Sequence, residues 1–121
     1  MELSTIIRVV AAVKIDPADS GRFENMVEAL KDVVRGEGPA KVLAYECYRK
    51  NENSSEYLIT EDYADEASFL GHLRLIAPVS ARHKVLMEVV QFYLCGSVSS
   101  DTVQLFETAY AEKFVNYGLR V

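Results

Sequence analysis

The sequence predicts one α+β domain whose elements follow the order strand, helix, strand, strand, helix, strand. Three features lead to this prediction: an apolar strand pattern near the N-terminus, a clean helical stripe after it, and two strand patterns joined by a polar turn. The length of 121 residues suits a single domain with a real core. Half of the residues are hydrophobic and 26% are charged, which is ordinary for a globular protein.

The first expected strand spans residues 5–15 and is apolar on both of its faces. Its odd positions from Ile7 to Ile15 are all apolar, and the even positions include Ile6, Val10 and Ala12. Helices of the same chain can cover only one face of a sheet. The other face must therefore meet a second sheet or another subunit, so we expect a homodimer.

A helix is expected next, because residues 17–20 offer a proline and short polar caps for its first turn. Its apolar positions recur at helical spacing and are Phe23, Met26, Val27, Leu30, Val33 and Val34. Gly36 or Gly38 can end this helix in a left-handed conformation. The charged residues at positions 28, 31, 32 and 35 form a solvated outer face.

Two strands are predicted at residues 42–50 and 56–63, since β-branched and aromatic residues alternate there with others. The polar run between them, at residues 50–55, is the turn of a hairpin. Asp65 can cap a following helix that carries His72 and ends near Leu75, because Pro78 disfavours helical conformation in the residue before it.

A helix is expected over residues 81–94, with Ser80 as its cap and a broad apolar stripe, either as a third helix or as a continuation of the preceding helix after a kink. A fourth strand is then expected over residues 102–108. The domain core would cover residues 5–108, and residues 109–121 would form a C-terminal extension. This extension keeps several large apolar side chains, so we expect it to dock, for example on a partner subunit.

Composition and charge disfavour several classes of protein. The formal net charge is −5 and the basic residues are scattered among acids, so nucleic acid is not an expected partner. No apolar run reaches the length of about 20 residues that spans a bilayer, and the N-terminus lacks the basic region of a signal peptide. We therefore expect no membrane association and a cytoplasmic protein. Cys47 and Cys95 are isolated, so they are expected to be reduced core thiols.

The order of these elements is that of a ferredoxin-like α+β domain with an antiparallel sheet. Within it, the segment YECYR at residues 45–49 and the segment YLITEDYADEASFLGHL at residues 57–73 resemble the antibiotic biosynthesis monooxygenase (ABM) domain family. The positions that match its pattern are Glu61, Tyr63, Asp65, Ala67 and, after a slip of one residue, His72. The resemblance covers roughly residues 5–108.

This resemblance implies a dimeric α/β barrel, in which two four-stranded sheets pack face to face and each leaves a small pocket beside its own helices. Members of the family oxygenate polycyclic aromatic or quinol substrates without a cofactor, degrade haem, isomerise small sugar-derived signals, or have no assigned activity. The chain contains no Trp, and its first strand has no Asn, which disfavours the haem-degrading branch.

His72 and Glu61 are the expected catalytic pair. An imidazole titrates near neutral pH and can act as the base that removes a phenolic or enolic proton, while Glu61 orients it. A hydrogen-bonded histidine at the helix edge is the alternative. Glu61 and Glu46 lie in apolar strands and need partners if buried. Either could bind a substrate hydroxyl, or form a structural pair with Arg8, Arg49 or a residue of the partner subunit.

Four tyrosines and the second histidine complete the expected binding residues. Tyr63, Tyr48 and Tyr45, with Tyr57, can line a pocket for a flat aromatic ligand, although strand tyrosines also serve cross-strand packing. His83 lies between basic residues and is either solvated or part of the site. No short ligand motif joins the two histidines, so no metal is expected. The resemblance to the ABM family implies a reaction without another cofactor.

The leading hypothesis is a cofactor-independent monooxygenase that acts on a small aromatic, quinol or related carbonyl compound. The second hypothesis is a dimeric small-ligand-binding or structural protein of the same fold without catalysis. Isomerisation of a small phosphorylated metabolite is a third, disfavoured by the absence of a Gly-rich phosphate loop.

Overall fold

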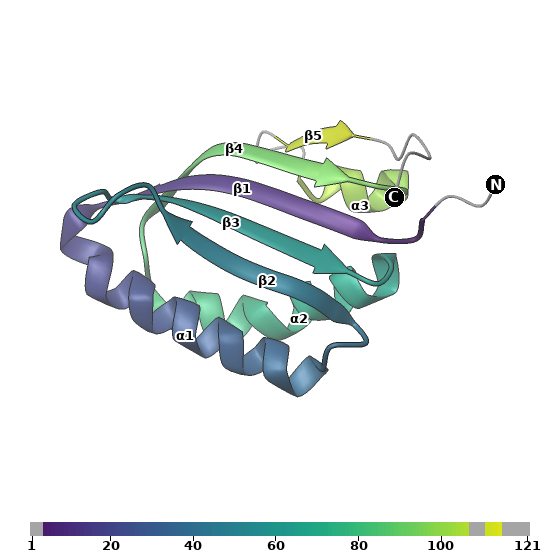
Figure 1. The fold of residues 1–121 in the computed structure, drawn as a ribbon, viewed down its shortest axis with the longest axis horizontal. Coiled ribbons are helices and arrows are strands. Elements are labelled where there is room, and N and C mark those ends of the chain that lie inside the picture. Colours follow the sequence, from purple (N-terminus) through teal and green to yellow (C-terminus); the bar gives the residue numbers. More distant parts are fainter. Residues whose placement is uncertain (1–3, 107–110, 115–121) are drawn as a thin grey trace.

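A twisted sheet with two helices on one face forms the body of the protein (Figure 1). The computed structural model describes residues 4–106 and 111–114. The strands lie in the order β2-β3-β1-β4-β5. The first four pair antiparallel, and β5 pairs parallel with β4. The predicted ferredoxin-like α+β fold is confirmed.

The first half of the chain folds as its pattern predicts. Strand β1 spans Ile7–Ile15, and its odd residues are buried against the helices. A short 3-10 turn at Pro17–Asp19 leads into helix α1, which spans Ser20–Glu37 and buries Phe23, Met26 and Leu30. Gly38 follows this helix with φ of 90°, which a glycine adopts without the steric cost of a side chain.

The hairpin and the start of the next helix also match the prediction. Strands β2 (Val42–Arg49) and β3 (Glu56–Tyr63) pair antiparallel, and β3 lies between β2 and β1. Asp65 caps helix α2 by accepting a hydrogen bond from the backbone N–H of Ser68 at 2.8 Å. The side chain of His72 then points to the sheet about two turns into the helix.

The predicted end of this helix is wrong. Helix α2 spans Glu66–His83 and continues through Pro78. A proline within a helix removes one backbone hydrogen bond. The turn beyond it carries Val79, which is buried in the main core cluster, so packing offsets that loss.

The predicted third helix is also wrong, because most of residues 81–94 form a strand. Strand β4 spans Met87–Cys95 and pairs with β1. Its register shifts between Ala12 and Val13 of β1, as in a β-bulge. The inward residues of β4 are consequently spaced two, three and two apart and are Met87, Val89, Phe92 and Leu94. The stripe that predicted a helix combined residues of both strand faces, because Val89 and Leu94 point inward whereas Val90 is exposed on the outer face.

The predicted fourth strand at residues 102–108 is replaced by a short helix. Helix α3 spans Ser100–Gln104, and the hydroxyl of Ser99 accepts a hydrogen bond from the backbone N–H of Thr102. Residues 107 and 108 lie outside the described residues. Of the expected C-terminal extension, the structure describes only β5 (Ala111–Phe114), which extends the sheet beside β4 of its own chain. Docking of the extension on a partner stays a prediction.

Candidate functional site

A mostly apolar cavity of about 200 Å³ lies between the inner face of the sheet and helices α1 and α2. Its wall includes residues from β1, β2, β3 and β4 as well as from both helices. The polar side chains of the lining are Tyr45, Cys47, Glu61 and Ser80. Burial raises the pKa of the Cys47 thiol, so it stays protonated near neutral pH. Glu61 is therefore the group of this lining that can carry a negative charge there.

The structure brings the two predicted catalytic residues together. His72 lies on α2 and Glu61 on β3, and the distance from His72 Nε2 to Glu61 Oε1 is 3.8 Å. This distance is too long for a hydrogen bond, and Nε2 is buried with no hydrogen-bond partner among the described atoms. His72 is fully buried and does not line the cavity. Substrate in the cavity would thus meet Glu61 first, with the imidazole behind it.

Glu37, which sequence reasoning missed, holds the other side of the imidazole. It is the last residue of α1, and its Oε1 lies 2.6 Å from His72 Nδ1. The side chain of Glu37 is only 5% exposed. The signal was present in the sequence: Glu37 falls three or four residues after Val33 and Val34 and continues the apolar stripe of this helix. An acid on a buried stripe needs a partner, and His72 is that partner.

Two tyrosines, the buried Tyr63 and the half-buried Tyr45, lie beside Glu61 and His72. The hydroxyl of Tyr63 donates a hydrogen bond to Glu61 Oε1. The rings of Tyr45 and Tyr63 each lie with their centroids 5.3 Å from that of His72. Burial is the main cause that raises the pKa of both phenols, with the Glu61 charge adding to it, so both remain protonated hydrogen-bond donors.

Glu61 itself has a raised pKa. Burial is the largest cause, and the nearby Glu37 adds to it, whereas the hydrogen bond from Tyr63 and the neighbouring His72 act in the opposite direction. Raised carboxyl pKa values are typical of groups that exchange protons near neutral pH. The arrangement can therefore accept a proton from a ligand and stabilise it between acid and imidazole.

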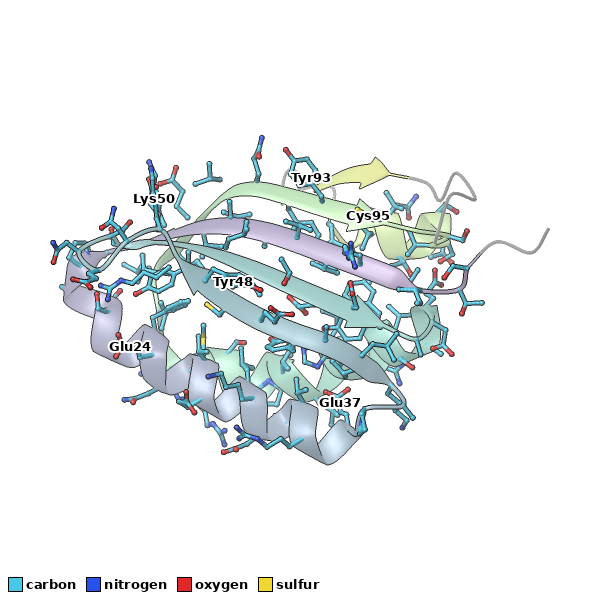
Figure 2. All side chains as sticks on the ribbon, in the orientation of Figure 1. Glu24, Glu37, Tyr48, Lys50, Tyr93 and Cys95 are labelled. Atoms are coloured by element: carbon cyan, nitrogen blue, oxygen red, sulfur yellow. The ribbon has the colours of Figure 1, made fainter. Side chains whose placement is uncertain are left out.

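Other predicted site residues lie elsewhere. Tyr48 donates a hydrogen bond to Glu46, and both side chains are exposed on the sheet face turned away from the helices. Lys50 and Tyr93 also extend away from the helices, whereas Glu37 lies in the helix layer (Figure 2). The Nδ1 of His83 lies 2.8 Å from the carbonyl of Val79, and His83 does not line the cavity. A binding role for Glu46, Tyr48 and His83 stays a prediction.

The expected structural pair between Arg8 and one of the two glutamates is not formed. Arg8 instead makes a two-pronged ion pair with Asp62 at 2.7 and 2.9 Å, on the outer face of the sheet. Glu61 faces the opposite side of the same strand. The polar neighbours of the Glu61 carboxyl are therefore His72 and the Tyr63 hydroxyl.

The raised pKa of Glu61 predicts how stability depends on pH. The folded chain binds the Glu61 proton more tightly than the unfolded chain does. The free energy of unfolding is therefore expected to fall as pH rises from the ordinary value of 4.5 through the raised pKa. Urea unfolding between pH 4 and pH 8 measures this slope, which Glu61→Gln should remove from that window. The same slope in wild type and variant would contradict the assignment.

A family model provides the first link to known proteins. The model described as "Antibiotic biosynthesis monooxygenase" (ABM) matches residues 6–77, which is more than half of the chain. The chain belongs to the ABM family. The matched region contains Glu37, Tyr45, Glu61, Tyr63 and His72, so the whole buried cluster lies inside the ABM domain. The resemblance seen in the sequence is confirmed.

Solved structures share the ABM fold at low sequence identity. MupZ from Pseudomonas fluorescens matches with a TM-score of 0.79 and 14% identity, over 100% of this chain and 92% of that chain. A candidate antibiotic biosynthesis monooxygenase from Caulobacter crescentus CB15 matches with a TM-score of 0.54 and 22% identity, over 73% of this chain and 90% of that one. A conserved protein from Methanosarcina mazei Go1 matches with a TM-score of 0.54 and 24% identity, over 70% and 90% of the respective chains. No curated protein matches the chain.

ABM membership indicates a monooxygenase-like or small-ligand-binding role. Among residues 4–106 and 111–114, no helix is long and apolar enough to cross a membrane. The same residues contain no group of three or more His, Cys, Asp or Glu side chains placed to hold a metal ion.

Proposed function

We propose that this ABM protein is a cofactor-independent monooxygenase that acts on a small aromatic, quinol or related carbonyl compound. The observation that carries the proposal is the apolar cavity whose ionisable carboxyl, Glu61, is backed by the buried imidazole of His72. Glu61 takes the proton of the substrate, and His72 is the base that receives it. Tyr45 shapes the wall of the cavity, and Tyr63 holds Glu61 through the hydrogen bond from its hydroxyl.

The size of the cavity limits the substrate. Pockets for drug-sized ligands measure about 300–1,000 Å³. A volume of about 200 Å³ suits a compound of one or two rings. The lining favours a flat apolar body with one hydroxyl or carbonyl placed against Glu61.

The proposed reaction converts a hydroquinone and dioxygen to a hydroxyquinone and water. Removal of a hydroxyl proton gives an anion that is rich enough in electrons to reduce dioxygen. One oxygen atom enters the ring, and the other leaves as water with two hydrogens from the substrate. The substrate supplies all of the electrons, and the protein supplies the base and returns the proton.

Oxygen consumption tests this proposal. Full-length protein is mixed with hydroquinones of one, two and three rings, and uptake is followed together with binding by calorimetry. We expect uptake with one or two rings, incorporation of one atom of ¹⁸O₂ into product, and no hydrogen peroxide. Tight binding without uptake would instead support the second candidate, a non-catalytic ligand-binding protein. The observation that favours this second candidate is the burial of His72 away from the cavity.

We also propose a homodimer that packs through the outer face of the sheet, as a dimeric α/β barrel. Large apolar side chains are exposed on this face, including Tyr48, Leu58 and Val90. They surround a groove of about 350 Å³. A cytoplasmic location completes the proposal and is supported by the two free thiols at Cys47 and Cys95.

The substitution Leu58→Glu is expected to convert the dimer to a monomer. Leu58 is 42% exposed in the isolated chain, and burying a carboxylate at a sheet interface without a partner costs several kcal/mol. Analytical ultracentrifugation at micromolar concentration measures the change. Leu75→Glu is the matched control, because Leu75 is an exposed leucine on helix α2 and not on the sheet. A monomeric wild type, or a Leu58→Glu dimer, would contradict the proposed interface.

A further inference from the structure

The buried imidazole of His72 separates two spaces that are lined by different glutamates. Glu61 lines the inner cavity, and Glu37 lines a separate depression of about 350 Å³ near the C-terminal end of α1 and the start of α2. His72 lines neither of them. In Figure 2, Glu37 lies at this end of the helix layer. The side chains form a chain from one space to the other: Glu61, His72, Glu37.

Because His72 is buried, its ring nitrogens have few possible hydrogen-bond partners. Its side chain is 0% exposed, while those of Glu37 and Glu61 are 5% and 14% exposed. The 2.6 Å contact between His72 Nδ1 and Glu37 Oε1 fits an imidazole proton on Nδ1, since a carboxylate oxygen accepts hydrogen bonds. Nε2 is then left with a lone pair that faces Glu61 and has no other partner among the described atoms.

We propose that Glu37 is the positioning residue of a proton port, which links the inner cavity to solvent through His72. This inference rests on the proposed function and deepens it, because it assigns a route for the substrate proton that needs no water in the cavity. Glu37 fixes the tautomer in which Nε2 can accept. It also receives the Nδ1 proton and releases it at the depression.

The transfer balances at every step. The substrate proton moves to the Glu61 carboxylate, and the resulting carboxylic acid passes it to His72 Nε2. Nδ1 then releases its own proton to Glu37, which gives it to water. The reverse sequence returns a proton and restores the tautomer. The first transfer to the ring requires the Glu61 carboxyl to move about 1 Å closer than its present 3.8 Å.

The groups around this chain are consistent with a port. The Tyr63 hydroxyl donates to Glu61, and Tyr45 packs its ring against the imidazole. Loss of hydration raises the pKa of both phenols, so they keep their protons and do not compete as bases. Around Glu37, the depression contains Lys41 and Asp65, which are charged groups that keep water at the outer end.

Nitrogen-15 NMR of histidine-labelled full-length protein tests the port without any substrate. The wild type is expected to show His72 as the Nδ1–H tautomer near neutral pH. His83 serves as an internal reference, because its Nδ1 faces the carbonyl of Val79. Finding His72 with its proton on Nε2 would overturn the proposal, and this measurement requires no variant.

Proton exchange then separates a port from a merely structural contact. In Glu37→Gln the amide oxygen can still accept from Nδ1–H but cannot take up a proton, so the tautomer should persist. Exchange of the Nδ1 proton with solvent should slow by about tenfold or more, since the remaining route is local opening. Asp32→Asn, an exposed acid of the same helix, should leave exchange unchanged. Equal exchange rates in wild type and Glu37→Gln would overturn the port.

Kinetics distinguish the port from the proposed oxygenase activity. With a hydroquinone that the wild-type protein oxidises, Glu37→Gln should lower kcat and leave KM unchanged, because Glu37 does not line the cavity. If no hydroquinone is oxidised, the proposed function fails while the NMR result still decides the port. A rise in KM at unchanged kcat would overturn the assigned role.

Discussion

The substitution Glu61→Gln is expected to lower the rate of hydroquinone oxidation by about 10²–10⁴-fold, the range that a positioned acid or base contributes. Gln keeps the size of the side chain, and its amide oxygen can still accept the hydrogen bond from Tyr63. It cannot accept the substrate proton or pass it to His72. Initial rates of oxygen uptake at saturating substrate measure the loss, and calorimetry checks that the ligand still binds.

Glu28→Gln is the matched control for this experiment. Glu28 is an exposed glutamate on α1 that pairs with Lys31 at 3.0 Å. Its substitution should leave the rate unchanged. Retention of full activity in Glu61→Gln would show that the carboxylate is not the group that takes the proton, whatever the effect on His72.

The substitution Gly96→Ala is expected to destabilise the fold by about 3 kcal/mol, or roughly 10 °C in Tm for a domain of this size. Gly96 follows β4 with φ of 117°, a conformation that L residues rarely adopt. A Cβ at this position would lie 2.6 Å from the backbone oxygen of Ile6 and 3.1 Å from Cδ1 of Ile7. The backbone oxygen cannot move without disturbing the start of β1. The backbone strain of an alanine at positive φ and the steric overlap of its Cβ therefore both lower the stability.

Thermal unfolding followed by circular dichroism measures this effect. Gly21→Ala is the control, because Gly21 lies in helix α1 and a Cβ there meets no atom within 4 Å. That change should leave stability unchanged or raise it by about 0.5–1 kcal/mol. A Gly96→Ala protein as stable as wild type would mean that the turn after β4 can relax.

Local patterns were sufficient for β1, α1, β2, β3 and the first turns of α2. In each case one periodicity dominates, and a cap or turn residue such as Gly38 or Asp65 marks the boundary. The family resemblance depends on this same part of the chain, which explains why it could be recognised before the structure was known. The predicted helix end before Pro78 was wrong for a different reason. Proline disfavours helical conformation in the preceding residue, but burial of Val79 in the next turn outweighs this preference.

The site was only partly predictable, because some of its residues are far apart in the sequence. His72 and Glu61 could be named because both belong to the family pattern, and the structure brings them within 3.8 Å. Glu37 lies 35 positions before His72, and no short spacing joins the two. Glu46 and Tyr48 alternate in sequence with Tyr45 and Cys47, but only the latter two face the cavity.

By itself, the sequence determined the α+β class, the order of the first five elements and a strand with two apolar faces, because these follow from periodicity within short segments. Only the tertiary structure decided that Met87–Cys95 is a strand, since apolar residues on both of its faces together give the sequence a stripe at helical spacing. Only the tertiary structure placed Glu37 against His72, because a buried acid finds its partner through packing of two helices on the sheet rather than through neighbouring positions in the chain.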